Sequence, residues 1–324
     1  MTSGTGPGPI VKPVAAKERA RSPFRRFGRA DRLAEFDAGL VEHADWGLFG
    51  PDSVTWRVHS HPIIVVGGFR ALMIQCLNPL AMAGVAQYSD FMIDPLKRFR
   101  RTAQYVHHVV FSDTQSAREA AARVRTVHEH VHGIDPVTGR EFHANDPELL
   151  LWVHCVEAHS FLTAYRTFVR ELPREDQDRY LSEQVAAAEL IGVPRELVPD
   201  SVDAYREYFA KMLPTLCTSK SAAETIRFVA RPNMRIVPVS EWPFAINLKI
   251  AGHAAVTVMP RSLRQIAGLP KPGPREWAFS RWIALNAKTM DRALHMPPLA
   301  AGFDQIASRK MGTGPIPALA RRSH

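Results

Sequence analysis

Patterns typical of α-helices follow one another along this chain, and over 95–111 cationic and aromatic positions recur every three or four residues, the spacing of one helical face. The region 226–259 includes β-branched residues but lacks the strict alternation of a sheet. The sequence therefore predicts an all-α fold in a single, mostly helical domain. The predicted helices cover residues 30–49, 69–88, 95–111 and 114–132, an apolar stretch opened by Asp146-Pro147, and a proline-punctuated region over 173–216.

The helix predicted over 114–132 has the clearest end signals. Asp113 or Thr114 can cap its first turn, alanines follow along its length, and Gly133 stands just past its end. Residues 135–139, which read Asp-Pro-Val-Thr-Gly, predict a turn directly after it.

Composition places the chain among globular proteins, since 46% of its residues are hydrophobic and 23% are charged. Residues 1–29 predict a disordered basic arm and 309–324 a loose basic tail, which leaves the domain itself over 30–308. Much of the net charge of +9 lies in these two ends. The basic residues form no patch interleaved with aromatic side chains, so no nucleic-acid partner is expected. On charge alone, the arm could contact a membrane surface.

Several features predict a cytoplasmic protein. The three cysteines show no metal-ligand spacing, and two stand in apolar stretches, as buried thiols do in a reducing compartment. Arg25-Arg26 is not followed by the apolar region of a signal sequence. The most apolar segment, 62–86, is interrupted by Gly67-Gly68, Arg70 and Asn78-Pro79, which favours a buried pair of helices over a membrane span.

Three histidines at the end of the 114–132 helix allow three kinds of site. His128-Glu129-His130-Val131-His132 satisfies the zinc motif H-E-x-x-H, in which two imidazoles share one helical face and the glutamate acts as a base. A third protein ligand is missing, because the extended motif needs glycine at Asp135 and histidine at Thr138. Glu129-x-x-His132 is also the repeating unit of a di-iron carboxylate bundle, but the chain has no second copy.

The third kind of site is a haem with one histidine as its axial ligand. His128 shares a helical face with apolar residues, while Glu129 and His130 turn away from it. A neutral imidazole in an apolar pocket suits the iron of a macrocycle. The alternative for His128 is a core histidine that donates a hydrogen bond to a carbonyl group. The apolar residues on its face are Ala117, Ala121, Val124 and Val131.

Two other helices carry groups that suit such a site. The 95–111 helix has a stripe of cationic and hydroxyl side chains, which is either a solvated basic face or a partner for carboxylates such as the two haem propionates. His154 and Glu157 stand in a strongly apolar helix, where titratable groups are costly without partners. They are either a structural hydrogen-bonded pair or supporting groups of the same pocket. The stripe consists of Arg98, Arg101, Thr102 and Tyr105.

Six motifs occur in order over about residues 34–216. They are GLFGPDSVTW from Gly47, PLAMAGV from Pro79, Arg98-x-x-Arg101-Thr102, Arg125-x-x-His128 with Gly133 downstream, A-x-DPELL from Ala144, and WVH from Trp152. Together they resemble the DUF2236 family, which includes the rubber oxygenases called latex clearing proteins and the MpaB-type oxygenases. The resemblance implies an all-α helical bundle with a globin-like core that binds b-type haem.

The resemblance also implies roles for individual residues. The family's proximal haem histidine falls on His128, and the arginine that accompanies it on the same helix falls on Arg125. The distal arginine and threonine of the family fall on Arg98 and Thr102.

At three positions the chain departs from the family pattern. The lysine that can close the iron in latex clearing proteins falls on Arg101, which is a poor iron ligand because arginine stays protonated. A second family arginine falls on His132, and many relatives carry histidine where Asn78 stands. The candidate catalytic residues are thus Arg98, Arg101 and Thr102, and the candidate cofactor-binding residues are His128, Arg125, Arg98, His132 and His154, with His128 as the metal ligand.

The resulting hypothesis is a haem b (iron) oxygenase that uses dioxygen on a hydrophobic, alkene-bearing small molecule such as an isoprenoid chain. An apolar pocket lined from the 62–86 segment would hold that substrate away from water. One alternative is a non-catalytic cytosolic haem- or lipid-binding protein of the same fold. A more remote one is a zinc metallohydrolase that uses His128-Glu129-x-x-His132. Cleavage of polymer outside the cell is not expected.

Overall fold

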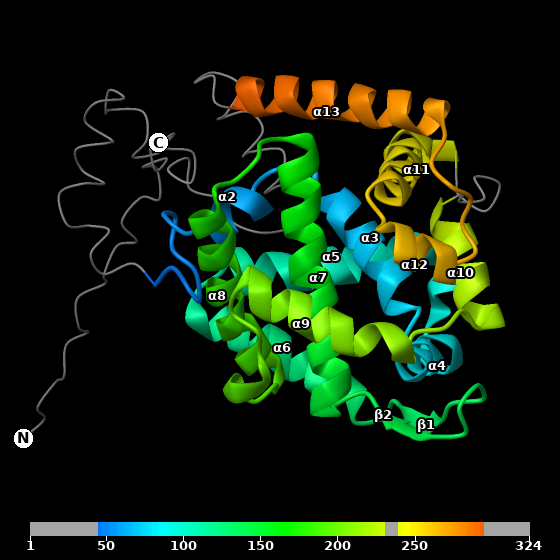
Figure 1. The fold of residues 1–324 in the computed structure, drawn as a ribbon. Helices are drawn as coiled ribbons and strands as arrows, with labels where there is room; N and C mark the ends of the chain where they lie inside the picture. Colours follow the sequence, from blue (N-terminus) through cyan, green and yellow to red (C-terminus); the bar gives the residue numbers. More distant parts are fainter. Residues whose placement is uncertain (1–44, 231–238, 295–324) are drawn as a thin grey trace, which may run out of the picture. The chain divides into compact units, whose positions relative to one another are not determined.

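Helices account for nearly all of the regular structure of this protein. The computed structural model describes residues 45–230 and 239–294, and within them the sole sheet is a two-stranded hairpin (Figure 1). The predicted all-α fold is confirmed. The arm predicted over 1–29, the tail predicted over 309–324 and the domain boundaries that they imply lie outside the described residues.

The helix predicted over 30–49 falls mostly outside the described residues, and its described end, 45–49, contains a turn instead. Gly47 has a φ angle of +71°, which belongs to the left-handed region and does not continue a right-handed helix. A Cβ atom at this position would collide with the carbonyl oxygen of Ser112. The prediction was wrong here because a contact with a distant residue decides the backbone conformation.

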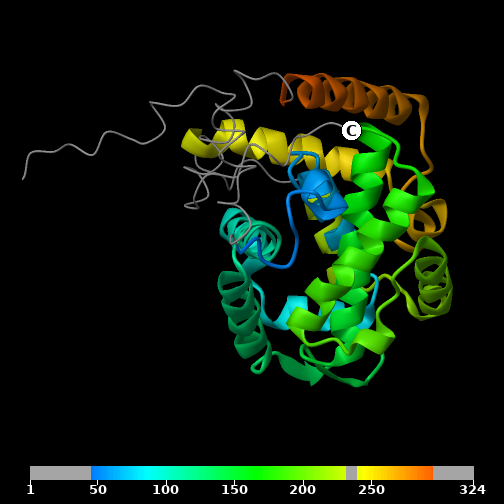
Figure 2. The ribbon, with the colours of Figure 1, turned by 90° about the vertical axis from the view of Figure 1, so that its left-hand side faces the viewer.

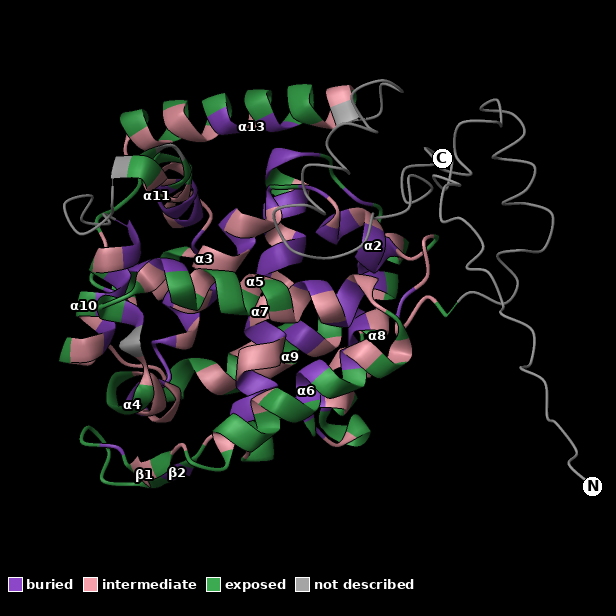
Figure 3. Cartoon of the chain, turned by 180° about the vertical axis from the view of Figure 1, so that it is seen from behind, coloured by how far each residue is buried: buried purple, intermediate pink, exposed green. Residues whose placement is uncertain are grey.

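The core is built on two helices that lie against each other, α7 (Pro147–Phe168) and α3 (Ile64–Gln75). The Asp146 side chain caps α7 by accepting a hydrogen bond from the Glu148 amide, and α7 is buried along most of its length, as predicted (Figure 3). At Gly67 the two backbones approach so closely that a Cβ atom would lie 2.9 Å from the Cα atom of Phe161. Because such an interior is close-packed, a displacement of one helix also displaces the helix packed against it.

The 62–86 segment forms a pair of helices, as predicted, and the helix predicted over 69–88 is thereby divided in two. α3 ends at Gln75, and the Asn78 side chain caps α4 (Pro79–Tyr88) by accepting from the amides of Leu80 and Ala81 at 3.0 and 3.1 Å. None of the described helices is by itself both long and apolar enough to cross a bilayer. α3 and α4 meet those criteria only as a pair bent by 105°.

The remaining core helices surround α3 and α7. α2 and α8 pack against each other, α11 lies on α3, and α13 lies across α7 and α11 (Figure 1). These helices bury their apolar faces against the central pair. Their bounds are Val54–His59 for α2, Arg174–Ile191 for α8, Val202–Met212 for α9, Lys220–Ala230 for α10, Trp242–Thr257 for α11, Arg261–Ile266 for α12 and Pro274–Leu294 for α13.

Two helices on one side of α7 carry most of the predicted site residues, α5 (Pro95–Phe111) and α6 (Thr114–His128) (Figure 2). α5 has the predicted bounds. Asp94 caps it by accepting from the Lys97 amide, and Asp113 caps α6 by accepting from the Ser116 amide. The two helices pack against each other, while the closest neighbour of α7 is α3.

α6 ends at His128, so the predicted end at His132 was wrong. Residues 129–131 turn away from the helix axis, and His132–Ile134 (β1) pairs in antiparallel register with Glu141–His143 (β2). Pairing between strands satisfies backbone groups that a longer helix would have satisfied within itself. The turn predicted over 135–139 is confirmed, since the Asp135 carboxylate accepts from the Val137 and Thr138 amides.

Candidate functional site

His128, the last residue of α6, is half-buried, and its helical face points toward the core as predicted. Ala117 and Ala121 on that face are completely buried, whereas Glu129 and His130 are exposed. The buried face of α6 therefore fixes the direction in which the imidazole points.

The imidazole of His128 has a buried nitrogen without a partner. Its Nδ1 atom meets no hydrogen-bond partner among the described residues. Burial lowers the pKa of the ring, and the positive charge of Arg98 lowers it further. The Asn145 amide raises that pKa, yet its Oδ1 atom is also buried without a partner, so the two side chains lie close but are not in hydrogen-bonding geometry. A neutral ring without the expected carbonyl partner does not match the core-histidine alternative.

The stripe predicted on α5 divides into two parts. Arg98 is accessible to solvent, yet enough protein surrounds it that burial lowers its pKa. Tyr105 is half-buried, and burial raises the pKa of its hydroxyl, so the group stays protonated. Arg101 and Thr102 are exposed and form no hydrogen bond or ion pair with a side chain in the described part of the chain. Burial thus shifts the pKa of Arg98 and of Tyr105, although the Arg98 side chain is exposed, as are those of Arg101 and Thr102.

His154 and Glu157 lie one turn apart on α7, and both are half-buried. Burial lowers the pKa of His154 to about 4, and its Nε2 atom is buried without a partner. Burial raises the pKa of Glu157 to about 7, although the Gln75 amide and the charge of Arg98 both lower it. A carboxyl group with a pKa near 7 can both release and accept a proton under physiological conditions.

Mutual charge effects connect these side chains across three helices. Arg98 and Glu157 each shift the pKa of the other, Glu157 also raises the pKa of Tyr105, and Arg98 acts on His128. These effects place the titratable groups of Arg98, Tyr105, His128 and Glu157 near one another, and His154 lies one turn before Glu157 on α7. We call this set the α5–α6–α7 site; it consists of Arg98, Tyr105, His128, His154 and Glu157.

Two other predicted cofactor residues lie at the edge of this set. Arg125 is exposed and donates a hydrogen bond to the Leu190 carbonyl at 3.3 Å, while its charge lowers the pKa of Tyr105. His132 lies on β1, where its ring is parallel to that of His143 with centroids 5.8 Å apart. Asn78, where many relatives carry histidine, acts as the cap of α4.

The structure contradicts both hypotheses in which several side chains hold a metal ion, the zinc site and the di-iron site. The zinc motif and the di-iron unit each require Glu129 and His132 on one helix, but α6 ends before either residue. Across residues 45–230 and 239–294, no group of three or more His, Cys, Asp or Glu side chains is placed to hold a metal ion. A single histidine ligand is what a haem requires of the protein.

Sequence reasoning missed three residues near the site: Gln75, Asn145 and His143. Gln75 ends α3 and acts on Glu157, Asn145 donates to the Arg125 carbonyl at 3.0 Å, and the charge of His143 lowers the pKa of His128. No sequence periodicity points to these residues. They reach the site because of the hairpin and because α3 crosses α7, which are features of the tertiary structure.

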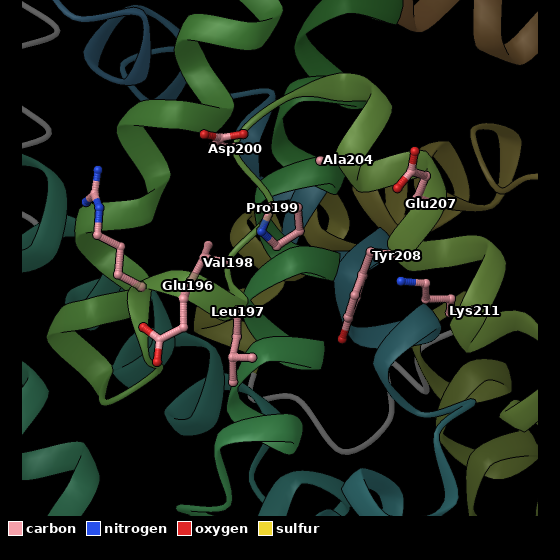
Figure 4. A pocket seen from close by; sticks show the side chains of 10 residues that line it. Glu196, Leu197, Val198, Pro199, Asp200, Ala204, Glu207, Tyr208 and Lys211 are labelled. Carbon is pink, nitrogen blue, oxygen red and sulfur yellow. The ribbon is translucent and has the colours of Figure 1, made fainter.

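A surface hollow of about 610 Å³ lies elsewhere, between η4 (Arg195–Leu197) and α9 (Figure 4). Its lining mixes Glu196, Glu207 and Lys211 with Leu197 and Tyr208. None of the predicted site residues lines it, and no histidine or cysteine does. The hollow therefore offers no chemistry comparable to that of the α5–α6–α7 site.

Comparison with known proteins gives one family. Residues 56–287 match the family described as ER-bound oxygenase mpaB/B'/Rubber oxygenase, catalytic domain. Searches of curated proteins and of solved structures each found no significant match. The matched range covers more than half of the chain and includes all five residues of the α5–α6–α7 site. The chain therefore belongs to the family of mpaB and rubber oxygenase catalytic domains.

Proposed function

We propose that this protein is a haem b-dependent oxygenase that acts with dioxygen on a hydrophobic, alkene-bearing small molecule, such as an isoprenoid chain. The observation that carries the proposal is the buried, unpartnered Nδ1 atom of His128 beside Arg98, within a domain that matches an oxygenase family. Membership of that family supports oxygenase chemistry, and the donor groups of the site support the choice of haem.

The residues present fit a haem. His128 is a neutral imidazole and would hold the iron, since only the neutral ring has a lone pair to offer. Arg98, Arg101 and Arg125 would meet the carboxylates of the cofactor, because guanidinium groups bind carboxylates through paired hydrogen bonds. His132 and His154 are the other two residues that would contact the cofactor. When bound, the iron of such a group supplies the binding and activation of dioxygen.

The protein's own contribution is charge and proton control. Arg98 provides a fixed positive charge, and the Glu157 carboxyl group, with its pKa of about 7, holds or releases a proton close to it. The protonated hydroxyl of Tyr105 is a hydrogen-bond donor in the same space. We assign proton transfer at the substrate to Glu157 and the orientation of polar reacting atoms to Arg98, with Thr102 one turn further along α5.

Aromatic side chains of α3, α5 and α11 would provide an apolar surface for the substrate. Phe69 of α3 and Phe99 of α5 have ring centroids 6.1 Å apart, and Phe244 of α11 lies 5.7 Å beyond Phe99. Phe69 belongs to the 62–86 segment expected to line the pocket, although most of the inner face of α3 is used for packing on α7. The substrate surface we propose is therefore shared by three helices.

The test compares His128→Ala with His130→Ala, a control that removes an exposed imidazole two residues away. Both variants and the parent protein are expressed with haem supply, and visible absorption and iron content are measured. We expect the parent and H130A to show a Soret band with stoichiometric iron and H128A to lose both. Oxygen uptake coupled to a carbonyl product is then measured with isoprenoid alkenes. Full haem in H128A would overturn the ligand assignment, and haem without oxygen uptake would indicate the non-catalytic binding protein.

A further inference from the structure

The outer face of α13 combines exposed apolar side chains with exposed cations. The helix is anchored to the domain by Ile283 and Ala287, which are 7% and 6% exposed. Its outer side is exposed along its whole length (Figure 3). α13 is therefore a fixed part of the domain that presents one complete face to the outside.

The charges of α13 are separated between its two faces. Its two carboxylates are paired on the inner side: Glu276 with Arg264 at 2.5 Å and Asp291 with Arg170 at 3.5 Å. The cations of the helix are exposed, and none of them forms an ion pair with a described residue. The outer face thus carries uncompensated positive charge. The cations are Arg275, Arg281, Lys288 and Arg292.

Large apolar side chains stand among these cations. Leu285 is 66% exposed and lies in one row with Arg281, Lys288 and Arg292, since these positions are spaced by three or four residues. Trp277 and Trp282, 63% and 49% exposed, flank the row. The Arg281 guanidinium lies 5.0 Å from the Trp277 ring centroid, a cation–π arrangement at the surface.

We propose that the outer face of α13 docks on the surface of an anionic lipid bilayer. Tryptophan rings favour the level of the lipid headgroups, and lysine and arginine beside them attract anionic headgroups. Leu285 at the centre of the face reaches deepest. The cations would also attract a nucleic acid, but the exposed leucine would add nothing to the affinity for a nucleic acid. The inference rests on this surface alone and is independent of the proposed function.

The experiment measures binding of the full chain to vesicles of phosphatidylcholine with or without phosphatidylserine, by co-sedimentation. The test variant is Arg281→Gln with Lys288→Gln. The matched control is Arg118→Gln with Arg123→Gln, which removes the same charge from the exposed side of α6. Each cation close to an anionic surface contributes about fivefold to the partition coefficient, so the α13 variant should bind roughly 25-fold more weakly. The control should change binding by less than about threefold, because its charges are not held at the surface.

A second variant tests the apolar part of the face. Trp277→Ala with Trp282→Ala should lose on the order of tenfold in partition to vesicles that contain phosphatidylserine. Circular dichroism checks that each variant stays folded. Equal losses in the α13 and α6 variants would mean that the chain ends or general charge drive binding and would overturn the proposal. So would a concentration-dependent dimer that dissociates in the tryptophan variant, because the face would then bind a second copy of the chain.

Discussion

The interface between α3 and α7 and the α5–α6–α7 site use two parts of one helix in opposite ways. Against α3, α7 packs Ser160 and Phe161, both buried, so closely that no room is left for a methyl group at Gly67. One to two turns earlier, the same helix carries His154 and Glu157, half-buried and with strongly shifted pKa values.

The difference shows how the domain keeps polar groups in a nearly dry environment. Titratable side chains that are desolvated without partners destabilise a fold, so they persist only where the rest of the structure is rigid enough to hold them. The tight packing of α3 on α7 supplies that rigidity, and Arg98 of α5 supplies a charge opposite to that of the Glu157 carboxylate. Each side of α7 can be tested separately.

The largest effect is expected from breaking the tight side with Gly67→Ala. Its Cβ atom would lie 2.9 Å from Phe161 Cα and 3.0 Å from the Ser160 carbonyl oxygen, and backbone atoms cannot move aside as a side chain can. We expect a loss of about 3 kcal/mol in the free energy of unfolding, measured by urea denaturation.

The control for this change is Gly68→Ala at the next position of α3. Its Cβ atom would meet only a side-chain atom, Phe161 Cε1, at 3.8 Å, which is ordinary contact. This variant should be as stable as the parent or slightly more stable, because alanine favours helix. If both variants were equally stable, the α3–α7 interface would not be the rigid element of the domain.

A smaller effect, of opposite sign, is expected on the polar side from Glu157→Gln. The pKa of Glu157 rises from 4.5 to about 7 on folding, so the folded protein binds more protons than the unfolded chain between these values. The contribution of Glu157 to stability therefore falls as pH rises through this window and stays low above it. We expect E157Q to gain about 1–2 kcal/mol over the parent between pH 4.5 and pH 8, measured by urea unfolding without added haem.

Glu148→Gln is the matched control for the carboxylate, since Glu148 is exposed at the start of the same helix. Its stability difference from the parent should not vary over that pH window. A pH-independent difference for E157Q as well would contradict the assignment of a titrating carboxyl group to the site.

The smallest effect sharpens the comparison at α6, the helix that positions His128. Asp113→Ala removes the side chain that accepts from the Ser116 amide at 2.9 Å, and should cost about 1 kcal/mol. Asp113→Asn keeps a side chain that caps helices well, so this variant should retain most of the stability that Asp113→Ala loses. Hydrogen exchange of the α6 amides is the more direct measurement; unchanged exchange in D113A would show that packing, not the cap, holds α6.

The fold was more predictable than the site. The start of α5, α6 and α7 follows from Asp94, Asp113 and Asp146, each of which caps the helix that begins after it. The direction of His128 followed from its apolar face. The neighbours of His128 did not, because Asn145 and His143 reach it through a hairpin that has no alternating pattern of its own.

The sequence by itself determined the starts of α5, α6 and α7, the turn over 135–139 and the inward face of α6, since these depend on hydrogen bonds and side-chain spacing within a few residues. Tertiary structure decided where α6 ends, that His132 pairs with His143, and that Arg98, His128 and Glu157 act on one another. Those features join residues far apart in the chain. Their energies come from burial and charge in three dimensions, which local spacing does not encode.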